Sequence, residues 1–542
     1  MARTPLLSRL QALFEDFEET TSSGRSIEAV QRQRRQREWT RRDFIKATGA
    51  TVGAVALGGP IAAFASQPPR IAVVGGGIAG LNAALTLRDA GIASTIYEAS
   101  NRVGGRMHSD TSTWDNGQTS EHCGELIDSR HKTILKLANR FNIPTVDLLA
   151  AEPTQSTETD FFFGHYYTRD QANADFGPVY NAVKKDLTAA GFPTLYNSFN
   201  QAGLALDQLS LYRWIESRVP GGHASRMGQL LDVAYNIEYG DISTEQSSLN
   251  LVYLLGFQPI PGNFRIFGAS DERYHLVGGN ELLPKAIAAS LPTGSVQLNT
   301  ALTAIAMNAA GTFTLSFSGP TGKFSSPFDR VLLAIPFSVL RKLNLRQAGF
   351  DSRKTTAIAE LGYGKNCKLQ LQFDTRLWNQ RGPWGISNGS TYADTGYQNT
   401  WEVTRGQDRA TGILVNYTGG GVPLASFKGQ PTIDDALNFG RTFLGQIEPV
   451  FPHISKHWNG LATLDVPLTD PFLLGSYSYW KVGQYTKFSG YEKARQPFPN
   501  GRCHFAGEHC SINFQGFMEG GAEEGARAAN EILGDYKAGI IP

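Results

Sequence analysis

Three glycines, Gly75, Gly77 and Gly80, follow four apolar residues with the spacing G-x-G-x-x-G. In a turn from strand to helix, the first glycine permits a tight bend and the second lets the backbone approach a pyrophosphate. The third lets the helix lie close to its strand, and the free N–H groups at the helix start face the phosphates. Glu98 lies 18 residues after Gly80, where a carboxylate can accept hydrogen bonds from ribose hydroxyls. These four residues predict a site for an adenine dinucleotide.

The elements that position these residues are predicted to be a strand at 71–74, a helix at 81–90 and a second strand at 94–97. A further apolar run at 329–336 predicts another buried parallel strand, ending where such a sheet meets its cofactor. From about 145 to 270 the pattern is mainly helical, with helices expected at 179–189, 206–218 and 226–238. This change of pattern predicts a second lobe inserted into a nucleotide-binding domain.

The composition limits the classes of function. The 542 residues are 41% hydrophobic and 18% charged, which is typical of a globular protein of more than one domain. Residues 1–66 hold ten Lys or Arg against seven Asp or Glu, so the remainder is slightly acidic. A body with that charge gives no electrostatic reason to expect nucleic-acid binding.

The first 66 residues resemble a leader with a twin-arginine export signal. Residues 40–46, which contain Arg41 and Arg42, precede a mildly apolar Gly/Ala-rich run, and residues 63–65 offer a small-residue cleavage site. The run is too short and too weakly hydrophobic to predict a stable membrane span. We therefore expect a periplasmic or secreted protein, exported folded by the twin-arginine machinery.

The four cysteines are Cys123, Cys367, Cys503 and Cys510, and they do not have the spacing of metal ligands. We predict no metal site. Whether Cys503 pairs with Cys510 stays open from the sequence.

After Glu98 the chain resembles the flavin-containing amine oxidases. The segment from Arg102 to Arg106 has the family's pattern R-x-G-G-R, which wraps the FAD pyrophosphate and approaches the flavin. The resemblance therefore implies FAD and not NAD. Gly105 can bring a backbone N–H onto phosphate, and Arg106 can add a charge-assisted fork.

The C-terminal part carries the same resemblance. Gly507 and Glu508 end a strand at the family's ribityl or pyrophosphate contact, and Gly516 begins the last helix, with its positive end near the flavin. Val296 aligns with a strand that bonds adenine through its backbone. The resemblance thus implies a cofactor site of Gly75, Gly77, Ile78, Ala79, Gly80, Glu98, Arg102, Gly105, Arg106, Val296, Gly507, Glu508, Gly516, Phe517 and Met518.

Three residues match the family's catalytic positions. Lys368, with Trp378 ten residues later, matches a lysine bonded through water to flavin N5, although Lys365 is an alternative. Tyr477 and Phe517 align with the two aromatics of the family's substrate cage. Some amine oxidases carry a cysteine joined to the flavin at the position before the first aromatic. This chain has Ser476 there, so we expect noncovalent FAD.

Glu125 and Asp128 match an element near the substrate cavity and are candidates to face a cationic amine. Alternatively, Asp128 or Ser129 caps the helix predicted at 131–141. Amino-acid oxidases of the family often carry an Arg aligned with residues 125–127, and this chain has none there, which favours amines. An amino-acid substrate stays open if a cation enters the cavity, and the candidates for that cation are Arg130, Arg265 and Arg273.

The resemblance implies an α/β fold in which a Rossmann-like FAD-binding domain is interleaved with an α+β substrate-binding domain. We assign residues 69–145, 272–350 and 465–538 to the first, and residues 146–271 and 351–464 to the second. The implied activity is hydride transfer from an amine carbon to flavin N5, with O2 reduced to H2O2 and the imine hydrolysed to a carbonyl. Alternatives are an L-amino-acid oxidase, an FAD-dependent desaturase or oxidase of an apolar substrate, and a flavin-bearing binding protein.

Overall fold

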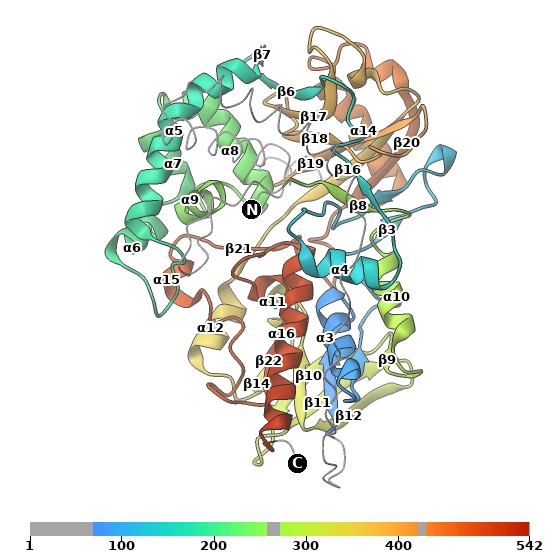
Figure 1. Ribbon diagram of the computed structural model, residues 1–542, viewed down its shortest axis with the longest axis vertical. Helices are drawn as coiled ribbons and strands as arrows, with labels where there is room; N and C mark the ends of the chain where they lie inside the picture. Colours follow the sequence, from blue (N-terminus) through green and yellow to red (C-terminus); the bar gives the residue numbers. More distant parts are fainter. Residues whose placement is uncertain (1–68, 257–270, 421–429, 541–542) are drawn as a thin grey trace, which may run out of the picture.

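The computed structural model describes residues 69–256, 271–420 and 430–540. These residues form two lobes, one above the other in Figure 1, and each lobe is assembled from separated segments of the chain. The twin-arginine segment at residues 40–46 lies outside the described residues, as does Arg265. Within the described ranges, no helix is long and apolar enough to cross a membrane.

The lower lobe is built on a five-stranded parallel sheet. Its strands in spatial order are β22 (Cys503–Phe505), β13 (Arg330–Leu333), β1 (Ile71–Val74), β2 (Thr95–Tyr97) and β9 (Val296–Gln297). All residues of β1 and β13 are buried, as the apolar runs of the sequence predict. The predicted strands at 71–74, 94–97 and 329–336 therefore meet in one sheet.

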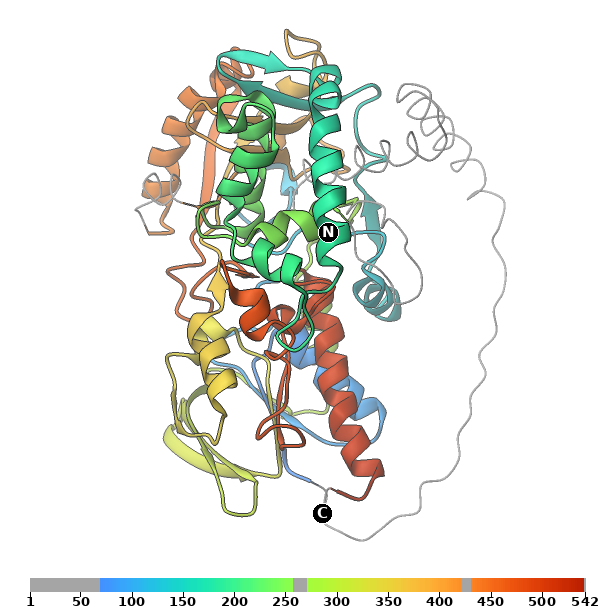
Figure 2. The ribbon, with the colours of Figure 1, turned by 90° about the vertical axis from the view of Figure 1, so that its left-hand side faces the viewer.

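Successive side chains of β1 pack into two different hydrophobic clusters. Ile71 and Val73 pack with the helices α3 (Ile78–Asp89) and α16 (Met518–Lys537), which lie side by side in Figures 1 and 2. Ala72 and Val74 pack in the cluster that contains Phe317 of a second sheet. That sheet has the order β12 (Gly322–Phe328), β11 (Phe313–Gly319), β10 (Ala301–Met307) and β14 (Asn344–Gln347).

The upper lobe contains a seven-stranded sheet. Its order is β20 (Trp458–Asp465), β16 (Cys367–Phe373), β19 (Gly412–Thr418), β18 (Asn399–Glu402), β17 (Ser387–Ala393), β6 (Thr157–Phe162) and β7 (His165–Tyr167). The β17–β6 pair is parallel and the other pairs are antiparallel. Every residue of β16 is buried, so Lys368 lies on a fully enclosed strand.

Five helices form the block on the left of Figure 1: α5 (Arg169–Ala190), α6 (Gln201–Asp207), α7 (Leu211–Arg218), α8 (Arg226–Tyr239) and α9 (Ser248–Leu255). α5 begins earlier than predicted because Thr168 and Gln171 form a capping box, and the helix continues through Pro178. The single helix predicted at 206–218 was wrong. Two helices occur there, and the hydroxyl of Ser210 accepts the Arg213 N–H at the start of α7.

Other α-helices and strands complete the described part of the chain. They are α4 (Lys132–Arg140), α10 (Leu282–Ser290), α11 (Phe337–Leu340), α12 (Ser352–Glu360), α14 (Ile433–Ile447), α15 (Gln484–Phe488), β3 (Ser109–Asp110), β4 (Ser120–Glu121), β5 (Thr145–Asp147), β8 (Tyr274–Leu276), β15 (Gly362–Tyr363) and β21 (Ser478–Tyr479). α12 falls in a segment assigned to the substrate domain, yet its Lys354 lies 3.8 Å from the ring centroid of Phe505 in the parallel sheet. The division at residue 350 therefore runs between elements that pack together.

The start of α4 corrects the capping prediction. Neither Asp128 nor Ser129 caps this helix, because the Asp128 carboxylate accepts the Glu272 N–H and Ser129 bonds to Asp271. The carboxylate of Glu519 instead accepts the N–H groups of Thr133 and Ile134, each at 2.8 Å. A residue of the last helix thus satisfies the first turn of α4, which no local sequence pattern could indicate.

Candidate active site

A cavity of about 750 Å³ lies at the carboxyl ends of the parallel strands and is lined by residues of both lobes. The predicted residues on its wall are Gly75, Gly77, Ile78, Ala79, Glu98, Arg102, Gly105, Arg106, Glu125, Lys368, Tyr477, Gly507, Glu508, Gly516, Phe517 and Met518. Gly80, Val296 and Asp128 are predicted site residues that do not line it. One continuous cavity therefore joins the glycine turn to the three residues predicted to be catalytic.

Of the three motif glycines, Gly77 has open space beside its Cα, whereas Gly75 and Gly80 do not. A Cβ on Gly80 would lie 2.0 Å from Gly75 O, so this glycine lets the helix pack against the turn. A Cβ on Gly77 would project toward the cavity, with its nearest atom, Gly104 O, at 4.0 Å. Because Gly77 begins α3 without a side-chain cap, the helix N-terminus can receive a phosphate there. The groove therefore fits a dinucleotide.

Glu98 closes the other side of this turn. One oxygen of its carboxylate accepts the Gly76 N–H at 2.6 Å, and the other accepts both the N–H and the hydroxyl of Ser100 at 2.8 Å. The side chain remains on the cavity wall. The carboxylate is thus held rigidly where the sequence predicts a ribose contact.

The partly buried Arg106 forms an ion pair with the buried Glu508, with Arg106 Nη1 at 2.9 Å from Glu508 Oε1. Burial alone would raise the pKa of Glu508, but the Arg106 guanidinium and the Ser478 hydroxyl hold this pKa below its usual range. Arg106 also donates to Ser476 O at 2.8 Å, and Glu508 accepts the Gly516 N–H. The predicted phosphate fork of Arg106 is therefore partly engaged by the protein itself.

Lys368 lies in the part of the cavity formed by the upper lobe. Its Nζ is 2.7 Å from Glu125 Oε2, and Trp401 Nε1 donates to Glu125 Oε1 at 2.8 Å. Lys365 is bonded to Asp241 outside the cavity, and its side chain is 38% exposed. Of the two candidate lysines, Lys368 is the one that reaches the site. Glu125 lines the cavity but is already paired with Lys368 and Trp401, and its predicted contact with a cationic amine stays a prediction.

Both predicted cage aromatics line the cavity. The Tyr477 hydroxyl donates to Ile237 O at 2.9 Å and lies 2.8 Å from the Tyr417 hydroxyl. Phe517 packs edge-to-face on His131, with ring centroids 5.1 Å apart. Burial lowers the pKa of His131 to about 4, so a neutral imidazole stands behind Phe517 at pH 7. Both rings are held firmly by these neighbours.

Ser476 lies on the cavity wall and donates from its hydroxyl to Asn366 Oδ1 at 2.6 Å. The four cysteines are free thiols, which answers the open question about Cys503 and Cys510. Among the described residues there is also no cluster of side chains suited to a metal ion.

Sequence reasoning missed three residues of the substrate end of the cavity: Glu272, Trp401 and Tyr417. Trp401 and Tyr417 lie on strands with no motif of their own, and each bonds a partner far away in the sequence. Glu272 precedes β8 in a segment where the sequence directed attention only to the following glycines. The only sequence feature that could have indicated Glu272 was its acidic side chain close to those glycines.

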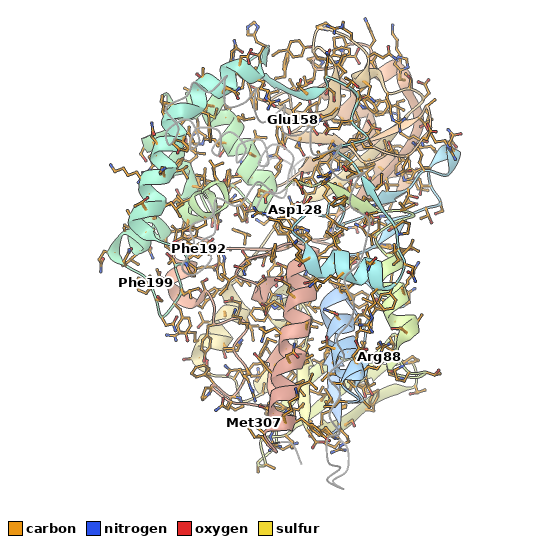
Figure 3. The ribbon with its side chains drawn as sticks, in the orientation of Figure 1. Arg88, Asp128, Glu158, Phe192, Phe199 and Met307 are labelled. Atoms are coloured by element: carbon orange, nitrogen blue, oxygen red, sulfur yellow. The ribbon has the colours of Figure 1, made fainter. Side chains whose placement is uncertain are left out.

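Two of the three cations proposed to hold a carboxylate, Arg130 and Arg273, do not line the cavity, and the third, Arg265, lies outside the described residues. Arg130 lies outside its wall, and Arg273 is paired with Asp147 at 2.7 Å. Asp128 is buried near the junction of the two lobes, as Figure 3 shows. The arrangement can therefore hold a dinucleotide and, beside its reactive end, a substrate between aromatic side chains and paired charges.

Comparison with known proteins gives one consistent result. Residues 78–533 match the family model described as flavin containing amine oxidoreductase. An L-amino-acid oxidase of Mus musculus is 24% identical over 501 residues, which are 88% of this chain and 72% of that protein. Polyamine oxidase 4 of Oryza sativa subsp. japonica is 24% identical over 475 residues, 86% of this chain and 89% of that protein.

Solved structures share the fold. Cyclohexylamine oxidase from Brevibacterium oxydans superposes with a TM-score of 0.73 at 19% identity, covering 87% of this chain and all of that one. Putrescine oxidase with bound putrescine gives a TM-score of 0.70 at 16% identity, covering 86% and 99%. At this identity the likeness concerns the fold alone.

Proposed function

Because the chain belongs to the family of flavin containing amine oxidoreductases, we propose that it is an FAD-dependent oxidase of amines. The observation that carries the proposal is the single cavity from the glycine turn at Gly77 to Lys368. FAD, when bound, would accept at its flavin N5 a hydride from the amine carbon and would pass the electrons to O2, giving H2O2. The imine left by the amine would hydrolyse to a carbonyl. Gly77, Glu98 and Gly516 would hold it noncovalently, with Ser476 at the position of the family's cysteine tether.

The chain's own residues prepare the amine for this step. Tyr477 and Phe517 are held by their neighbours and would orient the neutral amine between two aromatic faces. Lys368 is buried and fixed by Glu125, so its Nζ would hold a water and place positive charge beside the cofactor's reactive end.

The charge of the cavity favours amines over amino acids. An amino-acid substrate needs a cation for its carboxylate, ideally a bidentate Arg. Among the described wall residues, Lys368 is already paired with Glu125 and Arg106 with Glu508, and Arg102 donates to the backbone oxygens of Val103 and Gly105. The similarity to named L-amino-acid oxidases supports the alternative, with Arg265 as its remaining candidate cation.

A substrate panel tests the proposal. Anaerobic addition of putrescine, spermidine, cyclohexylamine or phenylethylamine to the purified holoenzyme should bleach the flavin absorbance, and in air the same amines should release peroxide. Bleaching by L-amino acids alone would favour the amino-acid oxidase. If neither class bleaches the flavin, a desaturase or a binding protein becomes the better description.

We also propose that the protein is exported folded by the twin-arginine route, which the Arg41-Arg42 pair and the following apolar run support. The variant with both arginines changed to lysine should retain activity in the cytoplasm and lose it from the periplasmic or secreted fraction. Unchanged distribution of that variant would argue against this route. Arg32→Lys together with Arg34→Lys is a control of equal charge outside the signal.

A further inference from the structure

His122 lies on the cavity wall and pairs with Asp465, and neither residue has a role in the proposed binding of FAD or amine. Its Nδ1 lies 2.8 Å from a carboxylate oxygen of Asp465, whereas no described residue bonds its Nε2. A carboxylate on one nitrogen fixes the orientation of the ring and stabilises its charged form. The other nitrogen then remains free to give a proton to a partner in the cavity.

The sheet of the upper lobe brings this pair close to Lys368. Asp465 and Lys368 are opposite each other in the antiparallel pair of β16 and β20, so their side chains leave the same face of the sheet. Glu121 directly precedes His122, and its backbone oxygen accepts from Lys368 Nζ at 3.2 Å. Lys368 and His122 therefore reach neighbouring parts of the cavity wall from separate segments of the chain.

The surroundings of His122 favour its charged form. Burial opposes the charge, but the hydrogen bond with Asp465 and the carboxylates of Asp110 and Glu121 outweigh burial and raise the pKa of His122 above its ordinary value of 6.5. His108 stacks on this ring with centroids 4.3 Å apart, and burial together with the charge of His122 lowers the pKa of His108 to about 4. The imidazolium of His122 is therefore present below its raised pKa and is lost as the pH rises through it.

His122 can release a proton at lower cost than Lys368. The Lys368 ammonium donates to Glu125 Oε2 at 2.7 Å, and both side chains are only 6% exposed. A neutral Lys368 would leave Glu125 as a buried carboxylate without its counter-charge. The side chains of His122 and Asp465 are 25% and 17% exposed, so a neutral imidazole leaves behind a carboxylate that keeps some contact with water.

We propose that the imidazolium of His122, oriented by Asp465, donates a proton when O2 is reduced to H2O2 in the cavity. This inference rests on the proposed oxidase activity. Both electrons and one of the two protons of H2O2 come from the reduced cofactor. The Nε2–H of His122 supplies the second proton, and the neutral imidazole regains one from water. Lys368 keeps its charge throughout and stabilises the negative charge that develops on oxygen.

The first test follows the O2 reaction separately from amine oxidation. The flavin of the holoenzyme is reduced photochemically without an amine and then mixed with O2 between about pH 6 and pH 9. In the wild type, the rate constant of reoxidation should fall as the pH rises through the pKa of His122. His122→Gln should slow reoxidation by about 100-fold at the acidic end and remove this fall. His457→Gln is the matched control and should behave as the wild type, since His457 pairs with Asp374 at 2.9 Å outside the cavity.

Nuclear magnetic resonance gives a readout that does not depend on turnover. In reduced, anaerobic holoenzyme labelled with 13C at histidine Cε1, the signal absent from His122→Gln identifies His122. Its titration should give a pKa above 6.5 that coincides with the midpoint of the reoxidation profile. Asp465→Asn keeps the imidazole but removes its main support, so it should move both midpoints to lower pH together.

The outcomes separate this inference from the proposed function. If His122→Gln is reoxidised at the wild-type rate, or if the kinetic and spectroscopic midpoints differ, His122 is not the proton donor. Because no amine is used to reduce the flavin, a failure of every amine to bleach it would overturn the amine oxidase without deciding the role of His122 in the O2 reaction. Where His122→Gln does not fold, Asp465→Asn decides the point: unchanged midpoints in that variant refute the inference.

Discussion

Two cations of the cavity wall, Lys368 and Arg106, lie beside buried carboxylates. Lys368 is paired with Glu125 and Arg106 with Glu508, so each of these cations has a carboxylate within hydrogen-bond distance. The positive charges of Lys368 and Arg106 are therefore each balanced by a nearby carboxylate, and both side chains are held in place by these pairs.

Lys368→Met should slow the reaction of the reduced enzyme with O2 by about 100-fold, because the positive charge is removed from the cavity. Stopped-flow recovery of flavin absorbance measures this step directly. Lys365→Met is the matched control, since Lys365 pairs with Asp241 outside the cavity. Equal reoxidation rates in the two variants would favour a desaturase, which does not need this lysine. The double variant with Glu125→Gln separates lost chemistry from the cost of an unpaired carboxylate.

Among the helices, α16 contacts both the cavity and the start of α4. Phe517 forms its N-cap and lines the cavity with Met518, while Glu519 in its first turn caps α4. Glu523, one turn later, lies beside Glu519 and Glu524. Burial, together with these two carboxylates, raises the pKa of Glu523 to about 7. The fold therefore resists the ionisation of Glu523.

Glu523→Gln should change how stability depends on pH. In the unfolded chain Glu523 ionises near the ordinary glutamate pKa of 4.5, whereas in the folded protein it stays protonated until about pH 7. The wild type therefore loses stability as pH rises from about 5 to about 7, and the glutamine variant lacks this loss. We expect the variant's Tm advantage to grow across that window by roughly 1–3 °C and then level off. Thermal melts of the holoenzyme at several pH values measure it, and an advantage independent of pH would contradict the assignment.

At the scale of the whole molecule, the local patterns were predictable and the long-range pairings were not. The apolar runs of β1 and β13 and the glycine turn follow from a few adjacent residues, so the parallel sheet and its cofactor edge could be predicted. The contact of Lys368 with Glu125 joins residues 243 positions apart, and the cap of α4 comes from a residue 385 or 386 positions away. Such contacts depend on how the two lobes pack, which spacing does not encode.

Because the cavity draws its walls from both lobes, the cofactor should stabilise the whole chain. Denaturation in acid should release all of the flavin, identified by chromatography as FAD, because Ser476 cannot form a thioether. The apoprotein should melt at a lower temperature, and added FAD should restore about 3–4 kcal/mol at 100 to 1,000 times its Kd, while FMN should restore much less. Flavin retained in the precipitate would instead mean a covalent link.

A side chain added at Gly77, at the start of α3, tests where the phosphates of FAD bind. Gly77 has φ −74°, so alanine is compatible with its backbone, and a Cβ there would enter only the space left for the pyrophosphate. Gly77→Ala should therefore weaken FAD binding by about tenfold or more without destabilising the apoprotein. Gly534→Ala, which adds a Cβ to α16 where no atom lies within 4 Å, is the control. If the two variants bind FAD equally well, the phosphates do not lie against the start of α3, and the cofactor must enter the cavity in another orientation.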